Sequence, residues 1–537
     1  MMIKSSFISL RQFLLVVVVA ILLSGLSACT GGTGSARSSQ PVYTAIFDAG
    51  SSGTRLLLYK VIRGHGSYPA ITRLASQEYD DNGISGFMNG QGTITLVAKG
   101  KNVLPGGVRP IHCTGGTQEM IKGSAGLDVI IKDLGMNDVS PCVLEPLLSS
   151  IDAILALHKL KKADVSIELF ATAGMRTEDR RNGGAWTAEQ INRYYGAMKS
   201  NVANLGFKTD EFKTINGNSE EGVWTWVNLN DHYFNSFGGN PNISKAVQPP
   251  VGNFEVGGSS MQVAFPTVKL PSDLENIYSV SINGYSFNVF SKTFLGLGGD
   301  DVRKYVKSIG YTHNDGGKNC YAKTATDINT KEERGVQLYP SSQVLGVSSL
   351  PYPFTANLGN TAIPWVQVPN VPTPRLTSSL MLSKQPSFNF ELCSGRYATV
   401  LDQVTSLERN KYGTFNDGDR ASLASFKEKV RTSLAPFVGI DNFFRTSNYL
   451  NYAPSTGFSA TTFLSKLTAY CAGQVADSRD LQNVCPNGVF MYTYLFGKAG
   501  LFAERPEAFA GVFNPKSATG DSVLSWARGY LLMKYAN

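Results

Sequence analysis

Two short apolar runs near the start of the chain are separated by a polar turn. Tyr43 to Phe47 and Leu56 to Tyr59 are both typical of buried β-strands. The turn between them, Asp48 to Arg55, is rich in Gly, Ser and Thr. Such a turn can direct several backbone N–H groups at one anion, and its aspartate suits a hydrated divalent cation. An ordinary hairpin turn explains the same residues equally well.

A similar turn occurs far downstream, at Glu255 to Gln262, and leads into the strand-like residues Val263 to Phe265. Both turns begin with an acid, an apolar residue and Gly, and continue with small residues and serines. The pair predicts a duplicated fold with one phosphate-binding turn in each half. Chance similarity between two Gly/Ser turns is the alternative.

Between the two turns, the pattern predicts further elements. Leu147 to Leu160 has helical periodicity, and Val165 to Phe170 is typical of a buried strand that ends in small residues, a common place for phosphate contacts. Residues 60–145 are rich in Gly and turn signals and are predicted to be irregular.

Gly217 to Asn230 has the features of a helix and its N-terminus. Asn218 and Glu221 have the spacing of an N-cap residue and its capping-box partner, which is a structural explanation for a glutamate here. The functional alternative makes Glu221 a general base, with Gly222 leaving room for substrate. Glu220 is expected to be an exposed acid of the first turn.

The first residues have the features of an export signal. Lys4 and Arg11 precede an unbroken apolar run, Phe13 to Leu23, which is short for a transmembrane helix. Leu26 to Cys29 resembles a bacterial lipobox, in which Cys29 is lipidated after cleavage. We therefore predict a signal peptide at 1–29 and a flexible tether at 30–40. Plain secretion after cleavage near Ala28 is the alternative.

The chain length and the net charge limit the number of domains and the kinds of ligand that we expect. The 537 residues are enough for two or more domains. The net charge of +8 favours acidic ligands such as nucleotides, but no Lys/Arg run indicates a nucleic-acid partner.

The cysteine count is that of an exported chain with disulfides. Apart from Cys29, six of the seven cysteines remain, an even number that allows 15 connectivities. Pairing of neighbours is the working hypothesis, and the pairs are Cys113–Cys142, Cys320–Cys393 and Cys471–Cys485. With only five scattered histidines, a structural zinc site is not expected.

Four stretches, in this order and at this spacing, resemble the conserved regions of the apyrase family, the nucleoside triphosphate diphosphohydrolases. They are Asp48 to Arg55, Ala171 to Arg176, Gly217 to Asn230 and Glu255 to Gln262. Looser similarity at Cys485 to Phe490 and Trp526 to Leu531 extends the resemblance over residues 43–535.

The resemblance implies a two-domain actin-like, sugar-kinase-like α/β fold. Each domain would carry a mixed sheet flanked by helices, with the active site in the cleft between the domains. We place the first domain at 41–214 plus 515–537 and the second at 215–514.

The resemblance also implies the reaction: water attacks and removes the γ- and then the β-phosphate of a nucleotide, with Mg²⁺ or Ca²⁺ as the cofactor. Glu221 would take the proton, Ser260 and Gln262 would hold the water, and Thr172 would lie near it. Asp48 and Glu255 would hold the metal ion through water, and Trp226 and Asn230 would shape the cleft. The phosphate-binding residues would be Ser51, Ser52, Gly53, Thr54, Arg55, Ala173, Gly257, Gly258 and Ser259.

One departure from the family pattern affects the interpretation. Glu255 stands where the family has Asp, and the extra methylene could move the metal ion or weaken activity. Two alternatives therefore stay open: a phosphatase of the related exopolyphosphatase/guanosine pentaphosphatase group, and a nucleotide-binding surface protein with little turnover. We expect a monomer that is lipid-anchored to a bacterial membrane, with the outer membrane implied by Thr30 after the lipobox.

Overall fold

A computed structural model describes most of the chain from residue 40 onward. The described residues are 40–51, 54–63, 68–80, 83–89, 92–94, 127–128, 131, 135–180, 185–240, 244–268, 276–300, 302–303, 306, 318–322, 388–398, 427–473, 479–513 and 526–536. The chain divides into two compact units, Met1–Gln40 and Pro41–Asn537, and the fold described below is that of the second unit. Cys29 lies outside the described residues, as does nearly all of 320–390.

The first sheet has seven strands in the order β5-β4-β3-β2-β1-β6-β7. Strands β1 to β5 form an antiparallel meander, whereas β6 and β7 run parallel to β1. The strands are β1 (Val42–Ala49), β2 (Thr54–Ile62), β3 (Ala70–Asp80), β4 (Gly83–Asn89), β5 (Gly92–Ile94), β6 (Val165–Ala171) and β7 (Lys208–Thr214).

The second sheet has six strands in the order β10-β11-β9-β8-β12-β13. Strands β8, β9, β11 and β10 pair antiparallel, whereas β12 and β13 run parallel to β8. The strands are β8 (Gly252–Val256), β9 (Ser260–Pro266), β10 (Ile277–Ile282), β11 (Tyr285–Leu295), β12 (Phe437–Asp441) and β13 (Phe509–Val512).

The two sheets repeat one arrangement. In each, a first strand pairs antiparallel with the next strand on one side and parallel with a later strand on the other. In the first hairpin, Asp48 lies opposite Arg55; in the second, Glu255 lies opposite Gln262. The duplication predicted from the two turns is therefore confirmed, as is the α/β class with two mixed sheets.

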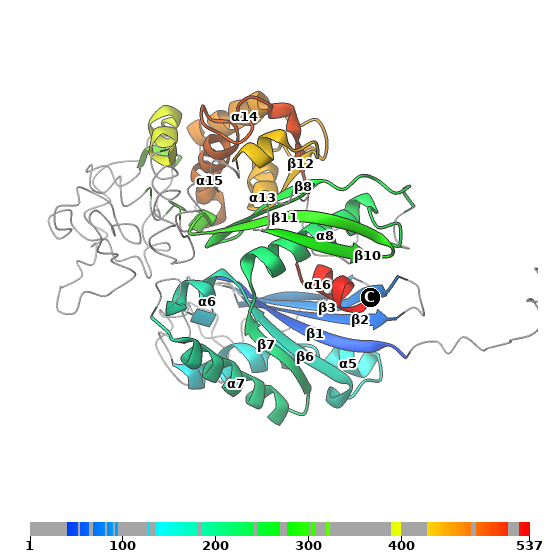
Figure 1. Cartoon of the computed structure of the whole chain (residues 1–537). Helices are drawn as coiled ribbons and strands as arrows, with labels where there is room; N and C mark the ends of the chain where they lie inside the picture. The colour runs from blue at the N-terminus through cyan, green and yellow to red at the C-terminus, as the bar shows by residue number, and fades with distance from the viewer. Residues whose placement is uncertain are drawn as a thin grey trace, which may run out of the picture. The chain divides into compact units, whose positions relative to one another are not determined.

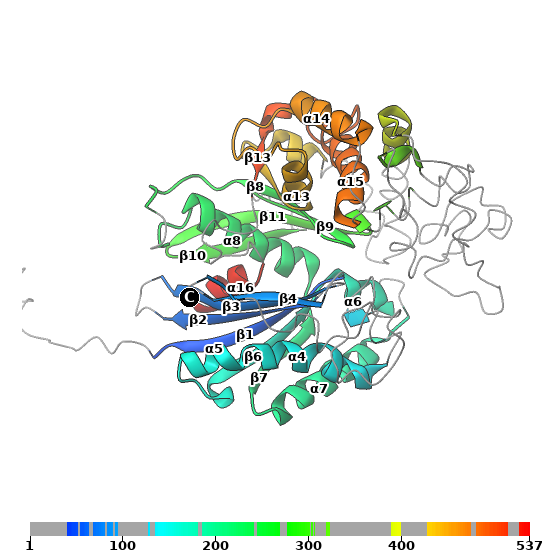
Figure 2. The ribbon, with the colours of Figure 1, turned by 180° about the vertical axis from the view of Figure 1, so that it is seen from behind.

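Helices α8 (Val223–Phe234) and α16 (Trp526–Tyr535) lie between the two sheets in both views (Figures 1 and 2). Apolar side chains from both helices and both sheets form one buried cluster there. The helices approach closely at Gly529, where a Cβ would collide with the carbonyl oxygen of Trp224. A buried ion pair also joins them, with Arg528 Nη1 2.6 Å from Asp231 Oδ2.

The outer face of each sheet is covered by other helices (Figure 2). The first sheet packs on a π-turn, η2 (Ser140–Leu144), and on α4 (Glu145–Ser150), α5 (Asp152–Leu157) and α7 (Ala188–Asn204). The second packs on α13 (Asn442–Tyr449), α14 (Ala460–Ala472) and α15 (Arg479–Phe496). The remaining short elements are η1 (Met136–Asp138), η3 (Lys162–Asp164), α6 (Ala173–Glu178), η5 (Gly217–Gly222), η6 (Lys318–Cys320) and η8 (Pro506–Ala508).

The prediction that residues 60–145 are irregular is wrong for part of that range. Strands β3, β4 and β5 lie within it. Glycine occurs in β4 and β5 but not in β3, and pairing within the meander decides the conformation of the two short strands β4 and β5. By contrast, the strand predicted at 165–170 is present as β6, and α4 and α5 supply the predicted helical segment, with a break at Ile151.

Two of the three predicted disulfides are present. Cys320 is bonded to Cys393, and Cys471 to Cys485. Cys113 of the third predicted pair lies outside the described residues. Among the residues that the structure describes, no helix is both long and apolar enough to cross a membrane.

Candidate active site

Glu221 lies in a π-turn, η5, directly before helix α8. The N-cap residue is Asn216, whose Oδ1 accepts from the N–H groups of Asn218 and Ser219. Glu220 completes the cap by accepting from the Asn216 N–H, and it also pairs with Lys213 at 2.7 Å. The predicted capping box between Asn218 and Glu221 is therefore wrong. Because the wider π-turn places Glu220 at the cap, the Glu221 side chain is left for another role.

The Glu221 carboxylate is held by Arg176, which the sequence analysis placed in a motif but gave no role. Arg176 Nη2 lies 2.5 Å from Glu221 Oε2 and 3.2 Å from Ser260 Oγ, and Nη1 donates to the Ile215 carbonyl. Arg176 and Glu221 are both buried. One guanidinium group thus brings together residues from three motifs.

Ser260 and Gln262 complete this network from the second turn. Gln262 Nε2 lies 2.7 Å from Ser260 Oγ, and both residues are buried. Thr172, predicted to lie near the water, is the N-cap residue of α6, and its N–H donates to the Ala49 carbonyl. The predicted residues Glu221 and Ser260 therefore meet at Arg176, and Gln262 joins them through the Ser260 hydroxyl.

The first turn contains a positively charged side chain, Arg55, beside its aspartate. Asp48, at the end of β1, is buried, and its Oδ2 lies 3.8 Å from Nη1 of the partly exposed Arg55. Ser51 packs against Gly174, where a Cβ would lie 3.2 Å from the Ser51 Cα, next to predicted residue Ala173. Thr54 is fully buried in β2 and has no hydrogen-bond partner for its hydroxyl within the described part of the chain. Ser52 and Gly53 lie outside the described residues.

The second turn is supported from behind by residues 296–300. The N–H groups of Gly296, Gly299 and Asp300 donate to the carbonyls of Ser259, Gly257 and Gly258. With these carbonyls turned toward the support, the N–H groups of Gly258 and Ser259 are the ones left to face an anion. The N–H group of Gly257, another predicted phosphate-binding residue, donates to the Ser260 carbonyl at 2.9 Å and so closes the turn.

Gly298 makes this support possible, and the sequence analysis missed it. A Cβ at this position would collide with the backbone of Gly258 and Ser259. The run Gly296-Leu297-Gly298-Gly299 directly after β11 was the available signal. Asn442 adds to the support by donating to the Val256 carbonyl at 2.8 Å.

Glu255 has the most unusual environment of the predicted site residues. Burial, followed by the negative charges of Glu221, Asp441 and Asp48, raises the pKa of the Glu255 carboxyl well above its usual value. The residue keeps some exposure, but its Oε2 is buried and has no hydrogen-bond partner among the described residues. Asp441, which the sequence analysis did not single out, ends the neighbouring strand β12.

These observations fit a divalent cation held mainly through water. An unpartnered buried carboxylate oxygen among several acids is stabilised by a nearby positive charge, and Mg²⁺ in particular keeps much of its water shell. In the described part of the chain, no group of three or more His, Cys, Asp or Glu side chains has the geometry of a direct metal site. Asp48 and Glu255 are the residues that would hold the cation.

Trp226 and Asn230 were predicted to shape a cleft, but both are fully buried in α8. Trp226 Nε1 donates to the Val251 carbonyl at 2.7 Å, and Asn230 bonds both the N–H and the carbonyl of Val251. They therefore support the segment that enters β8. Gly222 likewise makes room for a protein neighbour, because a Cβ there would collide with Ser291 of β11.

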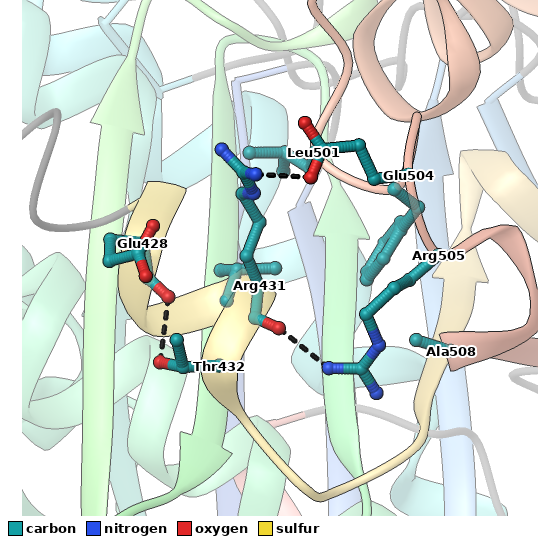
Figure 3. Close-up of a pocket in the computed structure, with 9 residues that line it drawn as sticks. Glu428, Arg431, Thr432, Leu501, Glu504, Arg505 and Ala508 are labelled. Carbon is teal, nitrogen blue, oxygen red and sulfur yellow. Dashed lines mark hydrogen bonds and ion pairs between the residues drawn. The ribbon is translucent and has the colours of Figure 1, made fainter.

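A small pocket of about 160 Å³ lies elsewhere, at the starts of β12 and β13 (Figure 3). Its two arginines are occupied: Arg431 pairs with Glu504, and Arg505 donates to the Arg431 carbonyl. Ligands of open α/β sheets bind at the carboxyl ends of the parallel strands, which is the edge where Glu255 and Asp441 lie. The pocket is therefore not the candidate active site.

Comparison with known proteins agrees with the resemblance that the four motifs carry. Residues 136–349 match the GDA1/CD39 (nucleoside phosphatase) family. The chain is 35% identical to probable apyrase 5 of Arabidopsis thaliana over 154 residues. This aligned stretch covers 28% of each chain. It is 26% identical to human ectonucleoside triphosphate diphosphohydrolase 2 over 389 residues. This aligned stretch covers 71% of this chain and 69% of that one.

A solved structure of nucleoside triphosphate hydrolases from Neospora caninum aligns over 98% of this chain and 97% of that one, with a TM-score of 0.48 and 13% identity. The chain spans just over a quarter of the length of the first curated relatives it matches. Residues 136–349 are similar to the nucleoside phosphatase family, and the resemblance to the apyrases that the motifs carry is confirmed.

Proposed function

We propose that the protein hydrolyses the terminal phosphates of nucleoside tri- and diphosphates by direct attack of water. The observation that carries this proposal is the contact of Arg176 with both Glu221 and Ser260, at 2.5 and 3.2 Å. Residues far apart in the sequence here form one arrangement that can hold and deprotonate a water molecule. The names of the relatives give the nucleotide class.

In this mechanism Glu221 accepts a proton from the water while the water oxygen bonds to the terminal phosphorus. The bond from that phosphorus to the bridging oxygen breaks, and the electron pair leaves with the shortened nucleotide. Ser260 and Gln262 orient the water, because hydroxyl and amide groups can both donate and accept. Phosphoryl transfer depends on such positioning and on charge neutralisation more than on a covalent intermediate.

The phosphates are bound by the two turns. The Gly258 and Ser259 N–H groups and the first turn around Ser51 are the donors in this proposal. A divalent cation, when bound near Asp48 and Glu255, neutralises the charge on the phosphate oxygens.

The decisive experiment measures phosphate release by the purified protein from ATP, ADP, GTP, UDP, pyrophosphate and polyphosphate, each with Mg²⁺, Ca²⁺ or EDTA. Release from tri- and diphosphates that EDTA abolishes is the expected result. Release from polyphosphate alone would transfer the protein to the exopolyphosphatase-like alternative. Nucleotide binding without release from any substrate would instead support the binding-protein alternative.

Export and lipid anchoring form a separate part of the proposal and rest on the first residues. Leu26 to Cys29 and the apolar run before it support attachment of a lipid at Cys29. Radiolabelled palmitate should be incorporated into the wild-type chain and not into Cys29→Ser. Equal labelling of the two proteins would exclude this anchor.

A further inference from the structure

A set of buried polar atoms without partners lies behind the second turn. Both side-chain polar atoms of Asn253 and the hydroxyl of Thr225 have no hydrogen-bond partner among the described residues, and both residues are fully buried. Glu255 Oε2 is also buried and has no hydrogen-bond partner among the described residues. Asn253 Nδ2 is a hydrogen-bond donor, Asn253 Oδ1 and Glu255 Oε2 are acceptors, and the Thr225 hydroxyl can be either.

These atoms belong to one layer between β8 and α8. Asn253 and Glu255 are two residues apart in β8, so their side chains share a face. Val251, on the same face, packs with Val438, Ile440 and Leu229 of α8. The Thr225 hydroxyl of α8 lies near the Glu255 carboxyl, where it opposes the rise of the pKa of that acid, but the two groups do not form a hydrogen bond of normal geometry.

The equivalent position in the first half of the molecule is different. Because Asp48 and Glu255 hold the same place in their hairpins, Ile46 is the counterpart of Asn253. Ile46 is fully buried in an apolar cluster. The first half thus combines the shorter acid with an apolar neighbour, and the second half combines the longer acid with a polar one.

We propose that Asn253, Thr225 and Glu255 Oε2 form a buried water-binding site that positions the Glu255 side chain from behind. A buried water needs two to four polar partners, and these atoms supply that number. Water can accept from Asn253 Nδ2 and donate to Glu255 Oε2 in one arrangement, which no single cation can do. Asn253 and Thr225 are positioning residues, because they act through Glu255.

The test is a double-mutant cycle on the full chain. It compares wild type with Asn253→Ile, with Glu255→Asp and with the double variant, which restores the pairing found in the first half. We expect each single change to lower Tm in the absence of metal, and the double variant to recover at least half of the summed loss. Additive losses of Tm, or a double variant below the worse single variant, would overturn the proposal.

A second measurement, the Mg²⁺ dependence of phosphate release, connects the water site to the metal ion. This measurement rests on the proposed function. Loss of an outer-shell partner typically costs about 10–100-fold in metal affinity. The Mg²⁺ concentration for half-maximal phosphate release should therefore rise about 10-fold or more in Asn253→Ile and fall back in the double variant. If wild type releases no phosphate, the proposed function fails while the Tm cycle still decides the water site.

Ser236 offers the matched control. Its hydroxyl is also buried without a partner among the described residues, but it lies beyond the far end of α8. Ser236→Ala combined with Glu255→Asp should be additive in Tm. Recovery in this pair as large as in the Asn253 pair would show that the coupling is not specific and would remove its support for the water site.

Discussion

The turn after β1 and the turn after β8 occupy the same place in two sheets of related strand order. The residue opposite the acid of each turn is nevertheless different: it is positively charged in the first turn and neutral in the second. Asp48 faces Arg55 across the first hairpin, with 3.8 Å between the charged groups. Glu255 faces the neutral Gln262, and that amide bonds Ser260 instead. The first turn therefore contains its own positive charge, and the second does not.

This difference allows the two halves to specialise. Because an amide occupies the place of the arginine, the second hairpin can join the network that holds Glu221. The consequence is an acid, Glu255, with a raised pKa and a buried oxygen without a partner. In the proposed mechanism such an acid would favour a bound divalent cation, and it lies in the same half as Ser260 and Gln262, the proposed water-orienting residues.

Replacing Glu221 tests the largest expected effect, because this residue is the proposed base and its partner Arg176 also contacts Ser260 of the second half. Glu221→Gln keeps the side-chain shape and removes the base. General-base catalysis contributes about 10²–10⁴-fold, so kcat should fall by that factor while nucleotide binding persists. Single-turnover kinetics and calorimetric titration with ATP measure the two quantities. A kcat near wild type would remove the assignment of Glu221 as the base.

Removing Arg176 would break the link from the first half to the second. Arg176→Met leaves the Glu221 carboxylate buried without its cation, and breaking a buried ion pair costs about 3–5 kcal/mol. Urea unfolding should show a loss of this size, and kcat should fall with it. Arg176→Lys, which keeps the charge, is the control and should recover part of both. Unchanged stability in Arg176→Met would mean that the pair does not hold the base.

The glycines that support each turn should differ in their tolerance of a methyl group. Gly298→Ala places the Cβ against backbone atoms of the second turn and should cost about 1–3 kcal/mol. In Gly174→Ala the nearest obstacle is the Asp128 carboxylate, a side chain that can move, so the loss should be smaller. Thermal unfolding of the two variants side by side measures the difference, and the reverse order would contradict it.

The smallest effect is expected where the two hairpins differ in charge. Arg55→Gln gives the first hairpin the residue of the second. Since the pair is long and Arg55 is 29% exposed on its side chain, the change should cost only about 0–1 kcal/mol. Chemical denaturation at low and at high salt tests this, with little difference expected at high salt. A loss well above that range would show that Asp48 depends on Arg55 for its place.

Several features could be read from the order of residues because they are local or covalent. The two turns, strand β6 and the pairing of Cys471 with Cys485 depend on short-range composition and spacing. Strands β4 and β5 could not be read in this way, since their short, glycine-containing sequences have little preference until the neighbouring strand provides a partner. The sequence pattern also could not show which of two adjacent glutamates caps this N-terminus. The π-helix moves the N-cap from Asn218 to Asn216 and its glutamate partner from Glu221 to Glu220.

The sequence by itself therefore determined the resemblance to the apyrases, the duplicated design and the identities of Glu221, Ser260 and Gln262 as candidate residues. Only the tertiary structure showed that Arg176 joins Glu221 to Ser260 and that Gly298 supports the second turn. The physical reason is that these contacts depend on strand register and helix packing between distant segments. Arg176 and Ser260, for example, are 84 positions apart in the chain and meet only when both sheets are formed.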